Sequence, residues 1–215
     1  MKKSAMLLLV LLFTTGAAIG QSAEDFGIVY RFDPAPQVWA NVDLLGPSFN
    51  YQNVQGLGVI YHFSDQVAIY PTLLFGFVKA TTEFEPDAGN TVDLEEESLL
   101  VFGIEVDVPI YLKQVDNVSV FVAPGLRVVT SVNDYQDKQN SANDEVARVS
   151  EFGGSVKLGG QVTFNRFAVF SSYGLRFDFA RITIEQDGGD AIASGPGFGT
   201  TQMSIGLIYY VGGDS

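Results

Sequence analysis

Apolar and polar side chains alternate with a period of two along most of this chain, which is typical of strands with two different faces. The segment 99–114, LLVFGIEVDVPIYLKQ, first looks like one apolar run interrupted by Glu105 and Asp107. Its even positions from Leu100 to Leu112 are bulky and apolar, whereas the two carboxylates fall on the odd face. A buried carboxylate is costly unless it is paired. The odd face is therefore expected to meet water or cationic side chains.

The same alternation, with enrichment in Val, Ile, Phe, Tyr and Gly, predicts eight strands and no amphipathic helix. The predicted strands cover 37–45, 54–63, 67–82, 95–112, 118–132, 148–164, 167–184 and 198–211. The segment FGIVYRF at 26–32 is the alternative first strand, or it belongs to an N-terminal segment that precedes the strands.

The connections between these strands alternate in length. Tight turns are expected at 64–66, 113–117 and 165–166. Long polar loops are expected at 83–94, 133–147 and 185–197. Short turns at one end and long loops at the other are typical of outer-membrane barrels, although soluble up-and-down barrels also contain hairpins.

Each strand has one bulky apolar face and one face of Gly, Ala, Ser, Thr and a few charges. The later strands, at about 14–18 residues, exceed the roughly five or six usual in soluble sheets. A tilted strand needs roughly 9–11 residues to cross the hydrocarbon, and small residues suit a narrow lumen. We therefore expect an all-β fold, an eight-stranded antiparallel up-and-down transmembrane β-barrel. A soluble lipocalin-like ligand-binding barrel is the alternative.

The N-terminus has the three parts of a secretory signal peptide: basic Lys2 and Lys3, the apolar run 6–13, and small residues before Gln21. This run is shorter than the roughly 20 residues of a spanning helix. The expected organisation is a cleaved signal peptide at 1–20, an N-terminal periplasmic segment at 21–36, the barrel at 37–211 and a short tail at 212–215.

Composition excludes several classes of function. Without Lys2 and Lys3 the chain has ten basic residues against 25 acidic ones, a net charge near −15, which repels nucleic acid. The absence of cysteine excludes disulfides and thiolate chemistry. The single histidine, His62, argues against a Ser-His-Asp triad, and a metal site there would need further ligands. We expect no catalytic residue, no metal and no cofactor.

The stretch GLGVIYHFSDQVAIYPTLLFGF (56–77) and the final MSIGLIYY resemble small outer-membrane proteins of the porin-like β-barrel domain family. The resemblance covers roughly 37–211 and implies the outer membrane of a diderm bacterium, reached by Sec-dependent export. It also implies a terminal-strand signal for the barrel-insertion machinery. The residues that would form this signal are Met203, Ile205, Leu207 and Tyr209. Outer-membrane lipid and lipopolysaccharide are the other expected partners, and a monomer is the expected state.

One candidate site is the set of charged residues on the inward face of four consecutive strands. We predict a lumen network of Glu105, Asp107, Arg127, Lys157, Arg176 and Asp178, with Gln161 nearby. Three acids and three bases in a narrow barrel predict a paired, rigid interior. The alternative interpretation is a polar pore lining.

A second candidate site is the acidic segment 82–98, which joins the third predicted strand to the fourth. It is expected to form an acidic extracellular loop containing Glu83, Glu85, Asp87, Asp93, Glu95, Glu96 and Glu97. The segment is either solvated surface, or it binds a basic partner or divalent cations that bridge to lipopolysaccharide phosphates. Its spacing does not match an EF-hand loop.

These observations favour a non-enzymatic envelope protein with a largely closed lumen, which contributes to envelope structure or surface interaction. The alternative function is a narrow porin-like channel for small or hydrophobic solutes.

Overall fold

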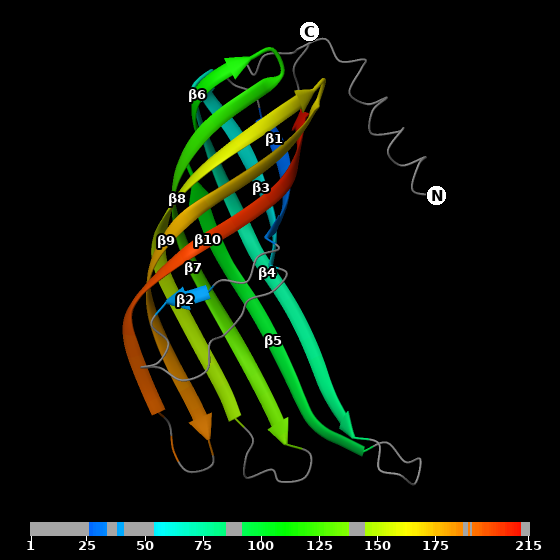
Figure 1. Cartoon of the computed structure of the whole chain (residues 1–215), viewed down its shortest axis with the longest axis vertical. Helices are drawn as coiled ribbons and strands as arrows, with labels where there is room; N and C mark the ends of the chain where they lie inside the picture. Colours follow the sequence, from blue (N-terminus) through cyan, green and yellow to red (C-terminus); the bar gives the residue numbers. More distant parts are fainter. Residues whose placement is uncertain are drawn as a thin grey trace.

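The computed structural model describes residues 26–33, 38–40, 54–84, 92–137, 145–186, 189 and 191–211, and nearly all of them form strands (Figure 1). The strands are β1 (Phe26–Asp33), β2 (Val38–Ala40), β3 (Val54–Ser64), β4 (Val67–Phe84), β5 (Val92–Asp107), β6 (Ile110–Val115), β7 (Val118–Asp137), β8 (Glu145–Phe164), β9 (Phe167–Gln186) and β10 (Ala191–Val211). Among the described residues, no helix is long and apolar enough to cross a membrane.

Eight of these strands form a closed ring. The order β1-β3-β4-β5-β7-β8-β9-β10 is antiparallel throughout, and β10 pairs with β1 to complete it. The short β6 prolongs β5 alongside β7, and the short β2 pairs with β10. The strands are inclined around the wall. β6 lies at one end of the barrel, and the end of β4 and the start of β5 lie at the other (Figure 1). The prediction of an eight-stranded antiparallel up-and-down barrel is confirmed.

The first ring strand is β1 and not the predicted strand 37–45. Phe26 pairs with Val211 on one side and with Tyr61 on the other. Within 37–45, Val38–Ala40 forms a short strand, and residues 37 and 41–45 lie outside the described part of the chain. Residues 26–33 therefore belong to the barrel wall rather than to a segment before it.

The predicted strand 95–112 is divided by Pro109, which has no N–H to give to a strand ladder. The backbone N–H of Val108 donates to the Pro124 carbonyl at 2.8 Å, and that of Ala68 donates to the Pro109 carbonyl at 3.0 Å. These two hydrogen bonds keep the divided strand attached to both neighbours. The register of pairing with β4 and β7 is the same on both sides of Pro109, so the division interrupts the predicted strand without shifting it.

The strands extend further at the loop end than predicted. Backbone pairing between β7 and β8 continues to Tyr135 and Glu145, and β10 already begins at Ala191. Much of the expected loops 133–147 and 185–197 is therefore sheet. The polar composition suggested loops because outward side chains at this end are polar, but a backbone ladder forms whatever the side chains face.

The tight turns use residues that tolerate a left-handed backbone. Asp116 and Asn165 have φ angles of 52° and 54°. Asp and Asn are the non-glycine residues that adopt this conformation most readily. The turn predicted at 113–117 contains only Asp116 and Asn117, because β6 extends to Val115.

The two faces of the wall have the predicted character. Outward side chains are large, apolar and exposed; they include Leu100, Phe102, Ile104, Leu126, Phe152, Leu158, Phe177 and Leu207. Inward side chains at the alternate positions are buried. An apolar surface that continues around the molecule suits lipid, whereas in water it would drive association.

Glycines on the inward face give room to the large side chains that fill the lumen. Gly206 lies directly opposite Phe170, and Gly159 lies directly opposite Phe121. A Cβ atom at either glycine would collide with the phenylalanine ring. The same relation holds for the opposed pairs Gly174 and Lys157, Gly125 and Asp107, and Gly153 and Asp178. The lumen is therefore filled by large side chains seated over small ones on the next strand.

We predict that Gly159→Val destabilises the barrel by about 1–3 kcal/mol, because its side chain would overlap the Phe121 ring. The matched control is Gly160→Val on the outward face, where an added Cβ has its nearest neighbour at 3.7 Å. We expect the control to change stability by less than about 0.5 kcal/mol. Denaturant unfolding in detergent micelles, followed by circular dichroism, measures both. Equal losses in the two variants would contradict the inward placement of Gly159.

Candidate functional site: the lumen charge network

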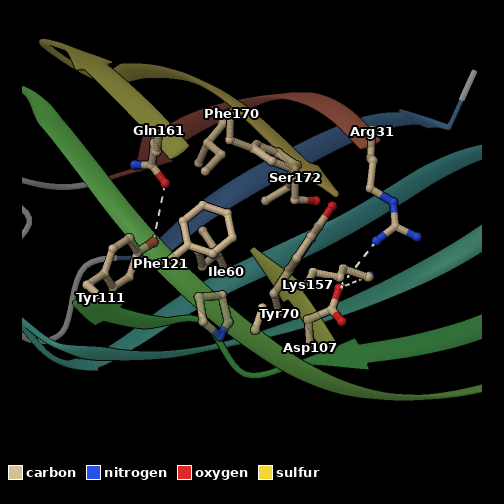
Figure 2. A pocket seen from close by; sticks show the side chains of 14 residues that line it. Arg31, Ile60, Tyr70, Asp107, Tyr111, Phe121, Lys157, Gln161, Phe170 and Ser172 are labelled. Atoms are coloured by element: carbon tan, nitrogen blue, oxygen red, sulfur yellow. Dashed lines mark hydrogen bonds and ion pairs between the residues drawn. The ribbon is translucent and has the colours of Figure 1, made fainter. Parts of the chain in front are cut away.

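Four charged side chains meet across the middle of the lumen. The Arg31 Nη2 atom lies 2.6 Å from Glu105 Oε2, and its Nη1 atom lies 3.4 Å from Asp107 Oδ2. Lys157 also pairs with Glu105, and its Nζ atom lies 2.7 Å from Asp107 Oδ2. Figure 2 shows Arg31 and Lys157 directed toward Asp107 from different strands. Two cations thus share two carboxylates.

A second group of ion pairs lies next to the first. The Nη2 atoms of Arg127 and Arg176 lie 3.5 Å and 3.6 Å from Glu151 Oε2. Arg176 also pairs with Asp178 through its Nε atom. Arg31, in the first group, also pairs with Asp33, whose Oδ1 atom lies 3.2 Å from Arg31 Nε.

The pleat and the narrow lumen together bring these residues into contact. Arg31 lies on β1, Glu105 on β5 and Lys157 on β8, and none of these strands neighbours another in the ring. Their side chains therefore meet by crossing the lumen. Glu105 and Arg127, in contrast, are directly opposed on β5 and β7.

All nine charged residues of the network are buried, with exposed fractions of 0–5%. An isolated buried ion costs several kcal/mol, so each charge needs close partners of opposite sign. The network has five carboxylates (Asp33, Glu105, Asp107, Glu151 and Asp178) and four cations (Arg31, Arg127, Lys157 and Arg176). Near balance of charge is what makes this burial tolerable.

The turn end of the lumen is occupied by a hydrogen-bonded aromatic layer. The Tyr111 hydroxyl donates to Gln161 Oε1 at 3.2 Å, and Gln161 Nε2 donates to the Tyr210 hydroxyl at 3.0 Å. The His62 ring is fully buried, stacks on Tyr111 at 5.5 Å between centroids, and has Nε2 3.4 Å from the Tyr210 hydroxyl. Phe121 packs edge-on against Tyr111. This layer lies between the turns and the charge network.

A cavity of about 20 Å³ separates the aromatic layer from the charge network. Figure 2 shows Tyr70, Lys157 and Ser172 on one side of it and Tyr111, Phe121 and Gln161 on the other. Such a volume holds about one water molecule. On the loop side, an apolar cluster lines the inner wall over β3, β4, β5 and β7; it contains Val54, Leu74, Val101 and Val129, with Leu99 packed against it.

The sequence located most of this site. The six predicted charged residues are all buried and inward, but Gln161 belongs to the aromatic layer. The prediction missed Arg31, Asp33 and Glu151. Glu151 lies on the same face of its strand as Lys157. Arg31 and Asp33 lie on the face opposite Tyr30 and Phe32. The period of two therefore indicated an inward position for all three.

The acidic segment is partly strand rather than loop. Glu83 belongs to β4, and β5 contains Asp93, Glu95, Glu96 and Glu97. Glu97 is exposed and accepts a hydrogen bond from Asn133 Nδ2 at 2.9 Å. Glu85 and Asp87 lie outside the described residues. Across the described chain, no group of three or more His, Asp or Glu side chains is arranged to hold a metal ion.

A closed antiparallel barrel with an apolar exterior and a polar, filled interior has the fold of small outer-membrane β-barrel proteins. The chain is similar to a major outer membrane protein from Thermus thermophilus, with a TM-score of 0.53, 12% identity, and coverage of 88% of this chain and 100% of that one. Two weaker similarities are to OprG from Pseudomonas aeruginosa and to Ail from Yersinia pestis. For OprG the TM-score is 0.46 and the identity 16%, with 90% of this chain and 99% of that one covered. For Ail the TM-score is 0.41 and the identity 13%, with 89% of this chain and 100% of that one covered. Identities this low show the fold alone. No protein-family model and no curated protein matches the sequence.

We predict that Glu105→Gln destabilises the barrel by about 3 kcal/mol, because Arg31 and Lys157 then share only Asp107. The control Glu185→Gln makes the same chemical change in an exposed pair, where Arg148 Nε lies 3.0 Å from Glu185 Oε1. An exposed pair contributes about 0–1 kcal/mol. Thermal and denaturant unfolding in micelles compare the two variants. A loss at Glu105 no larger than that at Glu185 would mean that the network does not stabilise the barrel.

Proposed function

We propose that this chain is a non-enzymatic outer-membrane β-barrel protein whose charge-paired lumen is closed to solutes. In this proposal it is exported by the Sec route with cleavage of residues 1–20, and it contributes to envelope structure or to interactions at the cell surface. The observation that carries the proposal is the filling of the lumen by buried aromatic, charged and apolar side chains.

The height of the apolar belt supports a position in a membrane. On β9 the outward side chains between Phe167 and Phe179 are exposed, and nearly all of them are apolar. Twelve residue steps at about 3.3 Å, tilted by about 35–45°, cover roughly 28–32 Å of membrane thickness. This value matches a hydrocarbon core of about 30 Å.

Aromatic pairs at the turn end support an interfacial position for that end. Tyr61 and Phe63 lie with ring centroids 5.1 Å apart, and Phe167 and Tyr209 lie 5.0 Å apart. Aromatic girdles of this kind occur where a barrel meets the membrane interface. We place the turns in the periplasm and the long loops outside the cell. The outward residues Met203, Ile205, Leu207 and Tyr209 of β10 then act as the insertion signal, and the barrel works as a monomer.

The size of the cavity supports a non-enzymatic role. The network carboxylates contact Arg and Lys side chains, and the neighbouring cavity of about 20 Å³ has room for about one water molecule. General acid–base catalysis needs a group that can reach a bound substrate. The described ion pairs fit a structural role instead.

We predict that the purified wild-type protein gives no steady single-channel steps in planar bilayers at any voltage. Arg127→Ala should lower the stability by about 3 kcal/mol, since Glu151 loses a buried partner. It should open no steady conductance, because the aromatic layer remains in place. Arg148→Ala, in an exposed pair, is the control for stability.

Two other results would replace this proposal. Steady wild-type steps that Arg127→Ala alters without loss of stability would establish a narrow channel. A mature chain that stays soluble after cell fractionation without detergent would establish a lipocalin-like barrel.

A further inference from the structure

A row of polar side chains crosses four strands on the outside of the barrel, at the loop-side edge of the apolar belt. Thr130 on β7, Ser150 on β8, Arg181 on β9 and Ser194 on β10 are directly opposed to their neighbours in the row, and all four are exposed. These strands lie next to one another in the ring. On these four strands the outward side chains of this row can all form hydrogen bonds, and the next outward residue of β10 is the exposed Ile192.

The next row toward the turn end is apolar. Val128, Phe152, Phe179 and Pro196 are opposed in the same way and are exposed. Arg181 lies two residues beyond Phe179, which at about 3.3 Å per residue and a tilt of about 35–45° places it roughly 5 Å past the belt. In a membrane this level contains lipid headgroups.

Arg181 differs from the other arginine in this area. Arg148, one row further out, is paired with Glu185. Arg181 has no ion pair or hydrogen bond to any residue in the described part of the chain. Its guanidinium is therefore available on the surface, with serine hydroxyls opposite it on both sides.

We infer that Arg181, Ser150 and Ser194 form a docking surface for the phosphate of a membrane lipid headgroup. Guanidinium binds phosphate oxygens through two parallel charge-assisted hydrogen bonds, and hydroxyls add further donors. The charge of Arg148, one row out, is balanced by its ion pair with Glu185, and the carboxylate of Asp134 lies another row further from the belt, so Arg181 supplies the positive charge of this surface. This inference rests on the proposed membrane location of the barrel.

Calorimetric titration of the protein in a neutral detergent with short-chain phosphatidic acid tests the inference. Diacylglycerol of the same chain length and inorganic phosphate are the comparison ligands. We expect saturable binding of phosphatidic acid, weakened about tenfold by Arg181→Gln through loss of the charge-assisted contacts. The matched control is Arg166→Gln, an exposed arginine in the turn between β8 and β9. It should leave the affinity unchanged.

Three results would overturn the inference. They are equal affinity for diacylglycerol and phosphatidic acid, equal affinity for inorganic phosphate and phosphatidic acid, and equal binding by wild type and Arg181→Gln. Cell fractionation separates this failure from failure of the membrane proposal. A wild-type chain in the membrane fraction that shows no phosphate preference leaves only the docking surface wrong, whereas a soluble chain overturns both.

Discussion

The placement of the Glu105 carboxylate between Arg31 and Lys157 is the interaction on which the interior depends. It joins three strands that share no backbone hydrogen bonds, because β1, β5 and β8 are separated around the ring. Each of the three charges is buried and would be strongly destabilising alone. The side chains can reach one another only across a narrow lumen. The pairing of these charges therefore depends on the narrow lumen that a ring of eight strands encloses.

The packing of the lumen follows from the same limit on space. Large side chains such as Phe121, Phe170 and Lys157 project inward, and a glycine lies opposite each of them on the neighbouring strand. A wall with medium-sized side chains everywhere would leave voids at some levels and collisions at others. The alternation of large and small residues around the ring fills the interior while the backbone circle stays closed.

The period of two was enough to predict which residues face inward, and hence most of the charge network. It did not predict which charges meet, because contacts across the lumen depend on the stagger of the strands around the whole ring. Arg31 was missed for a related reason: the strand that contains it is recognised as part of the wall only when both of its partners are known. The division at Pro109 follows from its missing N–H, whereas the sheet beyond residue 132 was set by backbone pairing, which polar composition does not report.

The pairing of Phe26 with Val211 has a consequence for how the barrel forms. The first and last strands of the described chain are neighbours, so the wall stays open until β10 has been made and delivered. Contacts between residues so distant in sequence form slowly, because a long loop must close first. Until then β1 and β10 each present an unpaired edge, which is hazardous in water and costly in lipid. The pairing of β1 with β10 is thus the step that closes the barrel.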